Sequence, residues 1–292
     1  NNIIVQNFEH IIASQIEHES ILNNQNVIKV DVNSKGYIDL EKLESITKCI
    51  KNKKNHIISV MLANNETGII QPVKRISQIA KKYNILFHTD AVQAVGRVNV
   101  NFNEIGCDFL TLSSHKIGGP KGAGALVVKN KKLLKAFFIG GSQEYNLRAG
   151  TESTTAIAGF GMAARTLNLK DMDSIQTLRD FFESELLNLN NDIQLIGNKS
   201  IRLPNTFMFC IPGIQSNEFL IALDIEGFEV SAGSACSSGK IEPSKILKAM
   251  GFSKNFLNSS IRVSLGPYNN REQAIAFAET VKNIKKRFLN TK

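Results

Sequence analysis

Polar side chains stand directly after three short β-branched runs of the sequence, at 57–62, 85–89 and 109–112. The polar residues that follow these runs are Asn64, Asn65, Glu66, Asp90, Gln93, Ser113, His115 and Lys116. In a parallel α/β sheet, ligands bind outside the carboxyl ends of the strands. Three polar strand ends in succession therefore predict one shared pocket.

A lysine and an aspartate at such an edge could serve an aldehyde cofactor. The stretch 113–124 (SSHKIGGPKGAG) lacks the G-x-x-x-x-G-K-[ST] spacing, which disfavours a nucleotide P-loop. Lys116 could instead form a Schiff base with pyridoxal phosphate (PLP), while Asp90 keeps the pyridine nitrogen protonated so that the ring accepts electrons. Ser113 and His115 would then bind the phosphate. Taken singly, Lys116 is equally a surface charge, His115 a turn residue and Asp90 a helix N-cap; only the combination favours a cofactor site.

Cys236 lies in a run of small residues, 231–240 (SAGSACSSGK), with no bulky apolar neighbour to bury it. Unpaired cysteines are usually buried and inert, so an open loop predicts either an expendable thiol or a nucleophile. The other cysteines, Cys49, Cys107 and Cys210, are widely spread and form no C-x-x-C pair. This spacing argues against a metal site and a disulfide framework, and it predicts a reducing compartment.

The composition is that of an ordinary globular protein. The 292 residues are 42% apolar and 21% charged, which suits one large domain or a large and a small one. No apolar run is long enough to span a bilayer, and the first residues lack the features of a signal peptide. We therefore expect a cytoplasmic protein, or one of the mitochondrial matrix in a eukaryote. The net charge of +9 is scattered without an aromatic-interleaved basic patch, so we expect no nucleic-acid or membrane partner.

Strand and helix patterns alternate in the first part of the chain. Strands are expected at 57–62, 85–89, 109–112 and 123–128, with a helix at 72–83 that has Pro72 in its first turn. This order predicts a largely parallel sheet covered by helices. From about Leu167 the pattern changes to that of a smaller α+β domain. Its expected elements are a helix at 173–189, a strand at 206–211, a helix at 218–225, a helix after Pro243, a strand at 261–265 and a C-terminal helix. We therefore expect domains at 1–168 and 169–292.

Seven stretches now make the sequence resemble the PLP-dependent cysteine desulfurases of the NifS/IscS type, which belong to the class V aminotransferase family. They are 15–22 (QIEHESIL), 61–71 (MLANNETGIIQ), 87–97 (FHTDAVQAVGR), 113–126 (SSHKIGGPKGAGAL), 147–153 (LRAGTES), 231–239 (SAGSACSSG) and 259–266 (SSIRVSLG). The resemblance implies the fold-type I architecture of aspartate aminotransferase, with a large PLP domain, a small C-terminal α+β domain and an obligate homodimer.

The resemblance also implies roles for matched residues around the cofactor. Lys116 would hold PLP, Asp90 would pair with the pyridine nitrogen, and His18 would stack on the ring and move protons. Gln93 and Asn65 would touch the ring's phenolic oxygen.

Other implied roles concern the phosphate, the substrate and the sulfur. Ser113 and His115 would bind the phosphate, and Thr151 would reach the phosphate of the other protomer. Arg262, with Asn65 close by, would grip the substrate carboxylate, because a guanidinium forms a bidentate pair that lysine does not copy. Cys236 would accept the sulfur.

The implied activity converts L-cysteine to L-alanine and leaves the sulfur as a persulfide on Cys236, for acceptors in iron–sulfur cluster assembly and tRNA thiolation. Two alternatives stay open. The family has a segment before residue 1 of this sequence, which ends in a phosphate-binding turn, so the chain could be a truncated, weakly active homologue that serves as a binding or dimerisation partner. It could also be a class V aminotransferase for another amino acid, which would share Lys116 and Asp90 but would not need Cys236. Departures from the family pattern fall at Ser142, Tyr145, Asn146 and Pro267.

Overall fold

The computed structural model describes residues 1–189, 192–232 and 243–290, and it divides into two compact units. The first unit comprises residues 1–32, 38–63 and 71–168. The second comprises residues 169–292 together with two short segments, 33–37 and 64–70. The polar segment that follows the first expected strand, 64–70, therefore groups with the C-terminal part of the chain.

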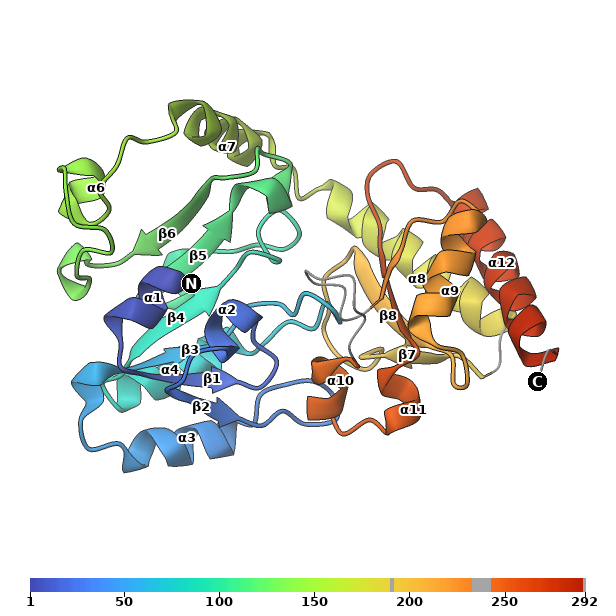
Figure 1. The fold of residues 1–292 in the computed structure, drawn as a ribbon, viewed down its shortest axis with the longest axis horizontal. Coiled ribbons are helices and arrows are strands. Elements are labelled where there is room, and N and C mark those ends of the chain that lie inside the picture. The colour runs from blue at the N-terminus through green and yellow to red at the C-terminus, as the bar shows by residue number, and fades with distance from the viewer. Residues whose placement is uncertain (190–191, 233–242, 291–292) are drawn as a thin grey trace. The chain divides into compact units, whose positions relative to one another are not determined.

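The first unit is built on a six-stranded sheet in the order β2-β1-β3-β4-β5-β6 (Figure 1). The strands are β1 (His10–Ser14), β2 (Val27–Val30), β3 (His56–Ser59), β4 (Leu86–Asp90), β5 (Phe109–Ser113) and β6 (Gly124–Val128). All neighbouring pairs are parallel except β5 with β6. The predicted mostly parallel sheet is confirmed, and β1 and β2 are strands that the sequence patterns did not reveal.

Helices cover both faces of this sheet because successive strand residues point to opposite sides. On one face, α1 (Asn2–Asn7) and α2 (Glu19–Leu22) pack on the strands. The buried cluster there is Ile4, Phe8, Ile11, Ala13, Ile21, Ile57 and Phe109. Elsewhere, α4 (Val73–Lys82) buries Val73, Ile76 and Ala80, which confirms the helix predicted at 72–83.

The remaining elements of the first unit are mostly short. They are α3 (Leu40–Cys49), η1 (Lys53–Asn55), α5 (Phe102–Ile105), η2 (Ser114–Ile117), η3 (Lys131–Leu133), α6 (Gln143–Asn146) and α7 (Thr154–Thr166). The last of these, α7, is long enough to bury a stripe but has no buried residue. Its apolar side chains are therefore partly or fully accessible to solvent.

The second unit has a four-stranded sheet in the order β7-β8-β10-β9, with antiparallel neighbours. The strands are β7 (Gln194–Ile196), β8 (Thr206–Cys210), β9 (Ser231–Ala232) and β10 (Ser260–Ser264). The helices are α8 (Asp171–Leu189), α9 (Ser216–Ile225), α10 (Lys245–Ala249), α11 (Lys254–Leu257) and α12 (Arg271–Asn290). One core joins α8, α9 and α12 to the sheet, with Phe182, Phe207, Phe209, Phe219 and Phe277 at its centre. The predicted α+β character of this part is confirmed.

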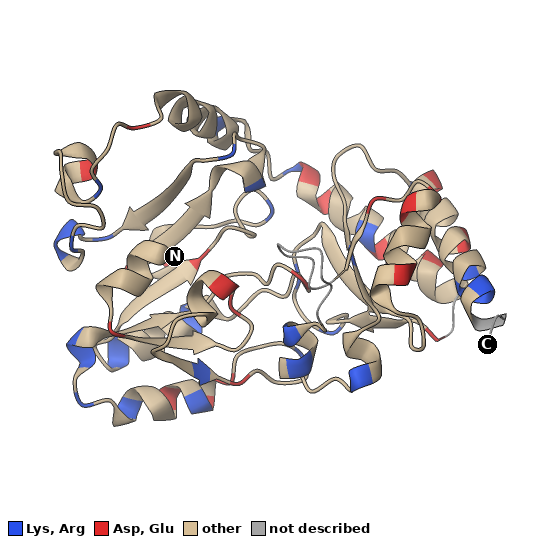
Figure 2. Ribbon diagram, viewed as in Figure 1, with Lys and Arg blue, Asp and Glu red and all other residues tan. Residues whose placement is uncertain are grey.

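Charged side chains are spread over both units (Figure 2). Lysines and arginines occur on helices and connections from α3 to α12, and acidic residues are interspersed among them. Within the described ranges, no helix combines the length and the apolar character that crossing a membrane requires.

Candidate active site

The Asp90 carboxylate closes β4 at the carboxyl edge of the parallel sheet, and it is only 8% exposed. The backbone N–H of Val92 donates to Oδ1 at 2.9 Å, and Asn1 Nδ2 donates to Oδ2 at 2.6 Å. Both carboxylate oxygens therefore accept a hydrogen bond, which fixes the orientation of the side chain at this edge.

His88 lies two residues before Asp90, on the same face of β4. His88 is fully buried; its Nδ1 lies 2.8 Å from Ser59 Oγ on β3, and its Nε2 lies 2.8 Å from Thr111 Oγ1 on β5. Burial lowers the pKa of His88 to about 3, so the ring is neutral. The hydrogen-bonded row Ser59–His88–Thr111 therefore connects the adjacent strands β3, β4 and β5, on the face of β4 that carries Asp90.

Lys116 lies on the turn that follows the next strand, β5. It belongs to η2 and its side chain is exposed, as is that of His115. Arg97 links this turn to the segment after β4, because Nη1 donates to the carbonyl of Gln93 at 2.8 Å and Nη2 to the carbonyl of Lys116 at 3.3 Å. Gln93 and Lys116 are thus held by one guanidinium.

Ser113 and His115 lie at the start of the same turn, with Ser113 Oγ 2.9 Å from His115 Nδ1. The turn closes where the N–H of Gly119 donates to the carbonyl of Ser114 at 3.0 Å. A side chain at Gly119 would clash with Ser114 Oγ, so only glycine lets the chain pass this closely. Ser114 Oγ is buried and has no partner among the described residues.

His18 lies beyond the end of β1 and caps α2. Its Nδ1 accepts from the N–H of Ser20 at 3.1 Å, which leaves Nε2 as the ring nitrogen that carries the proton in the neutral form. The neighbouring Glu17 is buried, and its Oε1 accepts from the N–H of Met61 at 2.8 Å. This bond ties the segment after β1 to the segment after β3. Burial raises the pKa of Glu17 well above its usual value.

Asn65 and Arg262 meet in the second unit. Arg262 extends from β10, where Nη1 donates to the carbonyl of Asn65 at 2.9 Å and Nη2 donates to Ser231 Oγ at 3.1 Å. These two bonds fix the plane of the guanidinium. The side chain is partly buried.

The segment 64–70 that holds Arg262 is itself tightly folded. Asn64 Oδ1 accepts from the N–H of Glu66 at 3.0 Å, the N–H of Thr67 at 2.9 Å and Thr67 Oγ1 at 3.1 Å. The N–H of Gly68 closes the turn on the carbonyl of Asn64 at 3.0 Å. Gly68 has φ of +72°, a conformation that other residues adopt only with strain.

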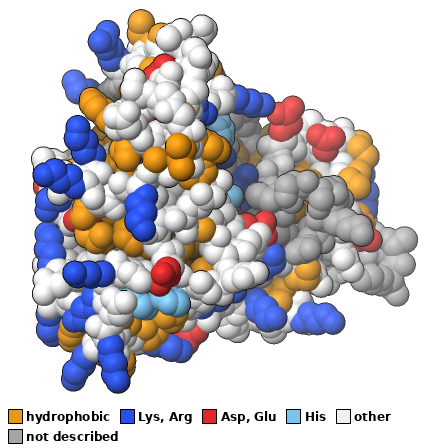
Figure 3. Space-filling view, turned by 60° about the vertical axis from the view of Figure 1, so that its left-hand side comes forward, with side chains coloured by type: hydrophobic (Ala, Val, Ile, Leu, Met, Phe, Trp, Pro, Cys, Tyr) orange, Lys and Arg blue, Asp and Glu red, His pale blue; other side chains and the backbone are white. Residues whose placement is uncertain are grey.

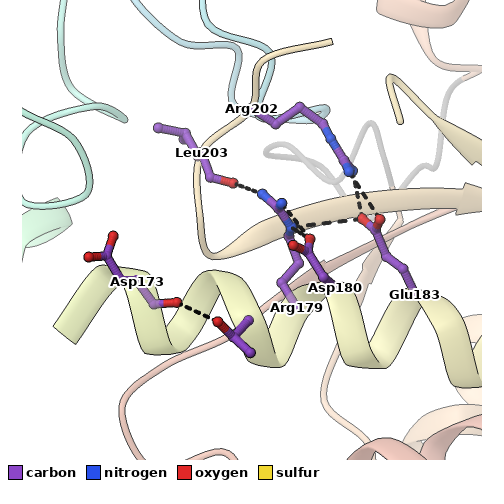
Figure 4. Close-up of polar contacts among 7 residues, drawn as sticks. Asp173, Arg179, Asp180, Glu183, Arg202 and Leu203 are labelled. Carbon is purple, nitrogen blue, oxygen red and sulfur yellow. Dashed lines mark hydrogen bonds and ion pairs between the residues drawn. The ribbon is translucent and has the colours of Figure 1, made fainter. Parts of the chain in front are cut away.

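A buried ion-pair network of Arg179, Glu183 and Arg202 (Figure 4) holds the connection that pairs with this segment. Arg202 and Glu183 form a bidentate pair at 2.7 and 3.0 Å, and Arg179 on α8 donates to the carbonyl of Leu203 at 2.7 Å. The strand-like segment so fixed pairs with 68–70: the N–H of Leu203 donates to the carbonyl of Gly68 at 2.8 Å, and the N–H of Ile70 to the carbonyl of Ile201 at 2.9 Å. The position of Asn65 therefore depends on α8.

Two predicted site residues are not among these groups: one lies apart from them and the other is not described. Thr151 is exposed in the connection that precedes α7. Cys236 lies outside the described residues. Of the other cysteines, Cys107 and Cys210 are buried and burial raises the pKa of each to about 12, so neither suits a thiolate nucleophile.

Four residues with fixed positions near these groups were missed by sequence reasoning, namely Glu17, His88, Arg97 and Ser244. The signal for His88 was available: a histidine inside an apolar run, beside a serine at the matching position of the preceding run. Glu17 and Ser244 are joined to their partners over 44 and 178 positions, which no local pattern reveals. Arg97 bonds to backbone carbonyls, which its sequence surroundings do not indicate. In the described ranges, no three His, Cys, Asp or Glu side chains gather as a metal site would require.

Comparisons with known proteins agree with this arrangement. A family model described as aminotransferase class-V matches residues 1–277. The "Cysteine desulfurase IscS" of Dictyoglomus turgidum is 40% identical over 275 residues, which cover 90% of this chain and 69% of that protein. A "Cysteine desulfurase" of Nostoc sp. is 38% identical over 290 residues, covering 95% of this chain and 71% of that protein.

The solved structures include a NifS-like protein from Rickettsia africae that superposes with a TM-score of 0.89. It is 36% identical, and the match covers 98% of this chain and 78% of that one. This likeness confirms the predicted fold-type I architecture. The chain belongs to the class V aminotransferase family, within the group of NifS/IscS-type cysteine desulfurases.

Proposed function

We propose that this protein is a PLP-dependent cysteine desulfurase that converts L-cysteine to L-alanine and retains the sulfur as a persulfide on Cys236. The observation that carries the proposal is the buried carboxylate of Asp90 at the end of β4, linked through Gln93 and Arg97 to the turn of Lys116 on the next strand. The names of the relatives favour desulfuration over the alternatives of an aminotransferase and a weakly active binding partner.

The donor set of the first unit fits PLP. Asp90 supplies a carboxylate for the pyridine nitrogen, and Lys116 supplies an exposed amine for the aldehyde. Ser113 and His115 supply a hydroxyl and an imidazole within one turn, suited to phosphate. Gln93, with Asn65 of the second unit, is proposed for the phenolic oxygen, and His18 is proposed for the ring face. The neutral His88 below Asp90 adds no positive charge that would compete for its carboxylate. We propose residues 1–168 as the PLP-binding domain and 169–292 as the domain that carries Cys236.

When bound, PLP supplies an electron sink for the charge that develops on the substrate. Arg262 orients the substrate by its carboxylate, with its own plane set by Asn65 and Ser231. The Lys116 amine takes the proton from Cα, and His18 Nε2 is placed to hold or pass a proton. The Cys236 thiolate attacks the substrate sulfur: an S–S bond forms and the Cβ–S bond breaks with its electron pair left on carbon. Cβ then gains a proton, and Cα regains the proton held by Lys116, which gives alanine.

A homodimer is part of the proposal, since the first unit exposes apolar side chains between β6 and the end of α7. They are Phe138, Ile139, Tyr145, Ile157 and Met162, with exposed fractions from 49% for Ile157 to 96% for Ile139. Figure 3 shows apolar side chains gathered on this side of the molecule among lysines and arginines. Exposed apolar groups of this kind mark interaction surfaces. Thr151 lies in the same stretch and is proposed to reach the phosphate of the partner's cofactor.

We propose acceptor proteins for the persulfide sulfur in iron–sulfur cluster assembly and tRNA thiolation, without direct nucleic-acid binding by this chain. A reducing location, the cytoplasm or the mitochondrial matrix in a eukaryote, would keep Cys236 available as a thiol. The chemistry proposed at the site is the same whichever acceptor protein and whichever of these locations applies.

The proposed function is tested by supplying L-cysteine to the PLP-loaded protein and measuring alanine and protein-bound persulfide. We expect both products in equal amounts during the first turnover. Cys49→Ser, at an exposed cysteine, serves as the control and should leave both yields unchanged. Alanine without persulfide on Cys236, or transamination to a keto acid, would contradict the proposal.

A further inference from the structure

Glu66 is a buried carboxyl group to which the mechanism above assigns no role. It is 8% exposed, and its Oε2 accepts from Ser244 Oγ at 2.8 Å. Ser244 is 1% exposed and also caps α10, where its Oγ accepts from the N–H of Leu247 at 3.2 Å. Because Ser244 is fixed by the helix, the carboxyl group of Glu66 is fixed as well.

The backbone connects Glu66 to the arginine proposed to bind substrate. The backbone carbonyl of the preceding residue, Asn65, accepts from Arg262 Nη1. The N–H of Glu66 donates to Asn64 Oδ1 at 3.0 Å. The carboxyl group and the guanidinium thus belong to one rigid group of residues within the second unit.

Burial and the neighbouring groups shift the pKa of Glu66 in opposite directions. Burial raises its pKa to about 7, and the hydrogen bond from Ser244 and the positive charges of Arg262 and Lys245 act in the opposite direction. Among the described residues, Arg262 on β10 and Lys245 at the start of α10 are the charged groups that act on it. Its charge therefore changes near neutral pH and is sensitive to any further charge at Arg262.

A substrate carboxylate at Arg262 brings a second negative charge to this group. Two carboxylates that share one cation disfavour each other's ionised form. We propose that Glu66 is the proton-linked partner of Arg262: when an amino-acid carboxylate binds Arg262, Glu66 takes one proton from the solvent and becomes neutral. The inference rests on the proposed function, because it requires Arg262 to be the carboxylate site.

The proposal fixes how affinity depends on pH. Below pH ~7, Glu66 already carries its proton in the free protein, so this group adds no pH dependence. Above pH ~7, each bound carboxylate requires a proton from solution, so the dissociation constant rises with pH by up to about tenfold per unit. Glu66→Gln keeps an oxygen acceptor for Ser244 but has no proton to exchange, so its affinity loses this dependence.

The test measures proton uptake when L-alanine binds to the PLP-loaded full chain, by titration calorimetry at about pH 8 in two buffers with different heats of ionisation. We expect the wild type to take up on the order of one proton more than Glu66→Gln. The matched control, Glu279→Gln on the exposed side of α12, should behave as the wild type. Infrared difference spectra of the wild type alone should show a new neutral carboxyl band on adding alanine.

Equal proton uptake by the wild type and Glu66→Gln, or no new carboxyl band in the wild type, would overturn the proposal and leave the proposed function intact. The function itself is tested separately by Arg262→Ala. If that variant binds alanine as tightly as the wild type, Arg262 is not the carboxylate site, and the assignment beneath the inference is wrong.

Discussion

Replacing Glu183 by alanine should strongly destabilise the second unit. Glu183 forms a bidentate pair with Arg202, and the two side chains are 11% and 5% exposed. The substitution leaves the Arg202 guanidinium buried without this carboxylate. Since Arg202 stands in the segment that pairs with 68–70, the loss should also loosen the residues that hold Arg262.

The magnitude follows from the burial of the pair. Removing one partner of a buried, hydrogen-bonded ion pair costs roughly 3–5 kcal/mol, because the remaining charge is left uncompensated. Solvent screening does not reduce this value much, as both side chains are nearly inaccessible. Replacing both partners by apolar residues, as in Glu183→Leu with Arg202→Met, should recover part of the loss, because Arg202 is then no longer a buried unpaired charge and the buried Arg179 keeps its ion pair with Asp180.

The assay is urea denaturation followed by circular dichroism, with Glu185→Ala as the control. Glu185 lies on the same helix, and its side chain makes no hydrogen bond or ion pair with the described part of the chain. We expect a change in unfolding free energy within about 0.5 kcal/mol for the control. If Glu183→Ala differs from the wild type by no more than the control does, the buried pair does not stabilise this unit and the reasoning is refuted.

Three further predictions concern the buried His88, the Cys236 thiol and the proposed dimer. The pKa of His88 lies at about 3 in the folded chain, so its contribution to stability is complete above pH ~6.5 and is lost as the pH falls, by up to about 1.4 kcal/mol per unit. Urea titrations of His88→Gln at several pH values should lack this part of the slope; identical slopes would count against a neutral buried ring. Cys236→Ser should keep the absorbance of bound PLP but form no persulfide, and sulfur transfer at the parent rate would refute the role of Cys236. Ile157→Glu with Met162→Glu should shift sedimentation toward the monomer, whereas Lys170→Glu at an exposed site should not.

The sheet of the first unit was predictable because its strands carry local signals. The runs at 57–62, 85–89 and 109–112 are rich in β-branched and large apolar residues, and strands β3, β4 and β5 lie within or across them. The helix at 72–83 has both a proline start and an apolar stripe. By contrast, α1, β1 and β2 are short, and their neighbours in space decide their structure rather than their own periodicity.

Candidate site residues were predictable to the extent that strand ends meet at one edge. Asp90 and Lys116 follow adjacent strands, so simple topology places them on the same edge of the sheet. Arg262 was different: its sequence surroundings resemble an ordinary strand, and only the family resemblance singled it out. Its contact with Asn65 spans 197 positions, and the bond between Ser244 and Glu66 spans 178. Pairings over such separations are set by the fold as a whole, so no short pattern predicts them.

The central claim is that Lys116 holds the cofactor opposite Asp90. It is tested most directly by incubating the full chain with PLP, reducing with borohydride and mapping the labelled peptide by mass spectrometry. We expect one pyridoxyl group on Lys116, no label in Lys116→Ala and weaker labelling in Asp90→Asn. Label confined to a different lysine, and unchanged by either substitution, would contradict it.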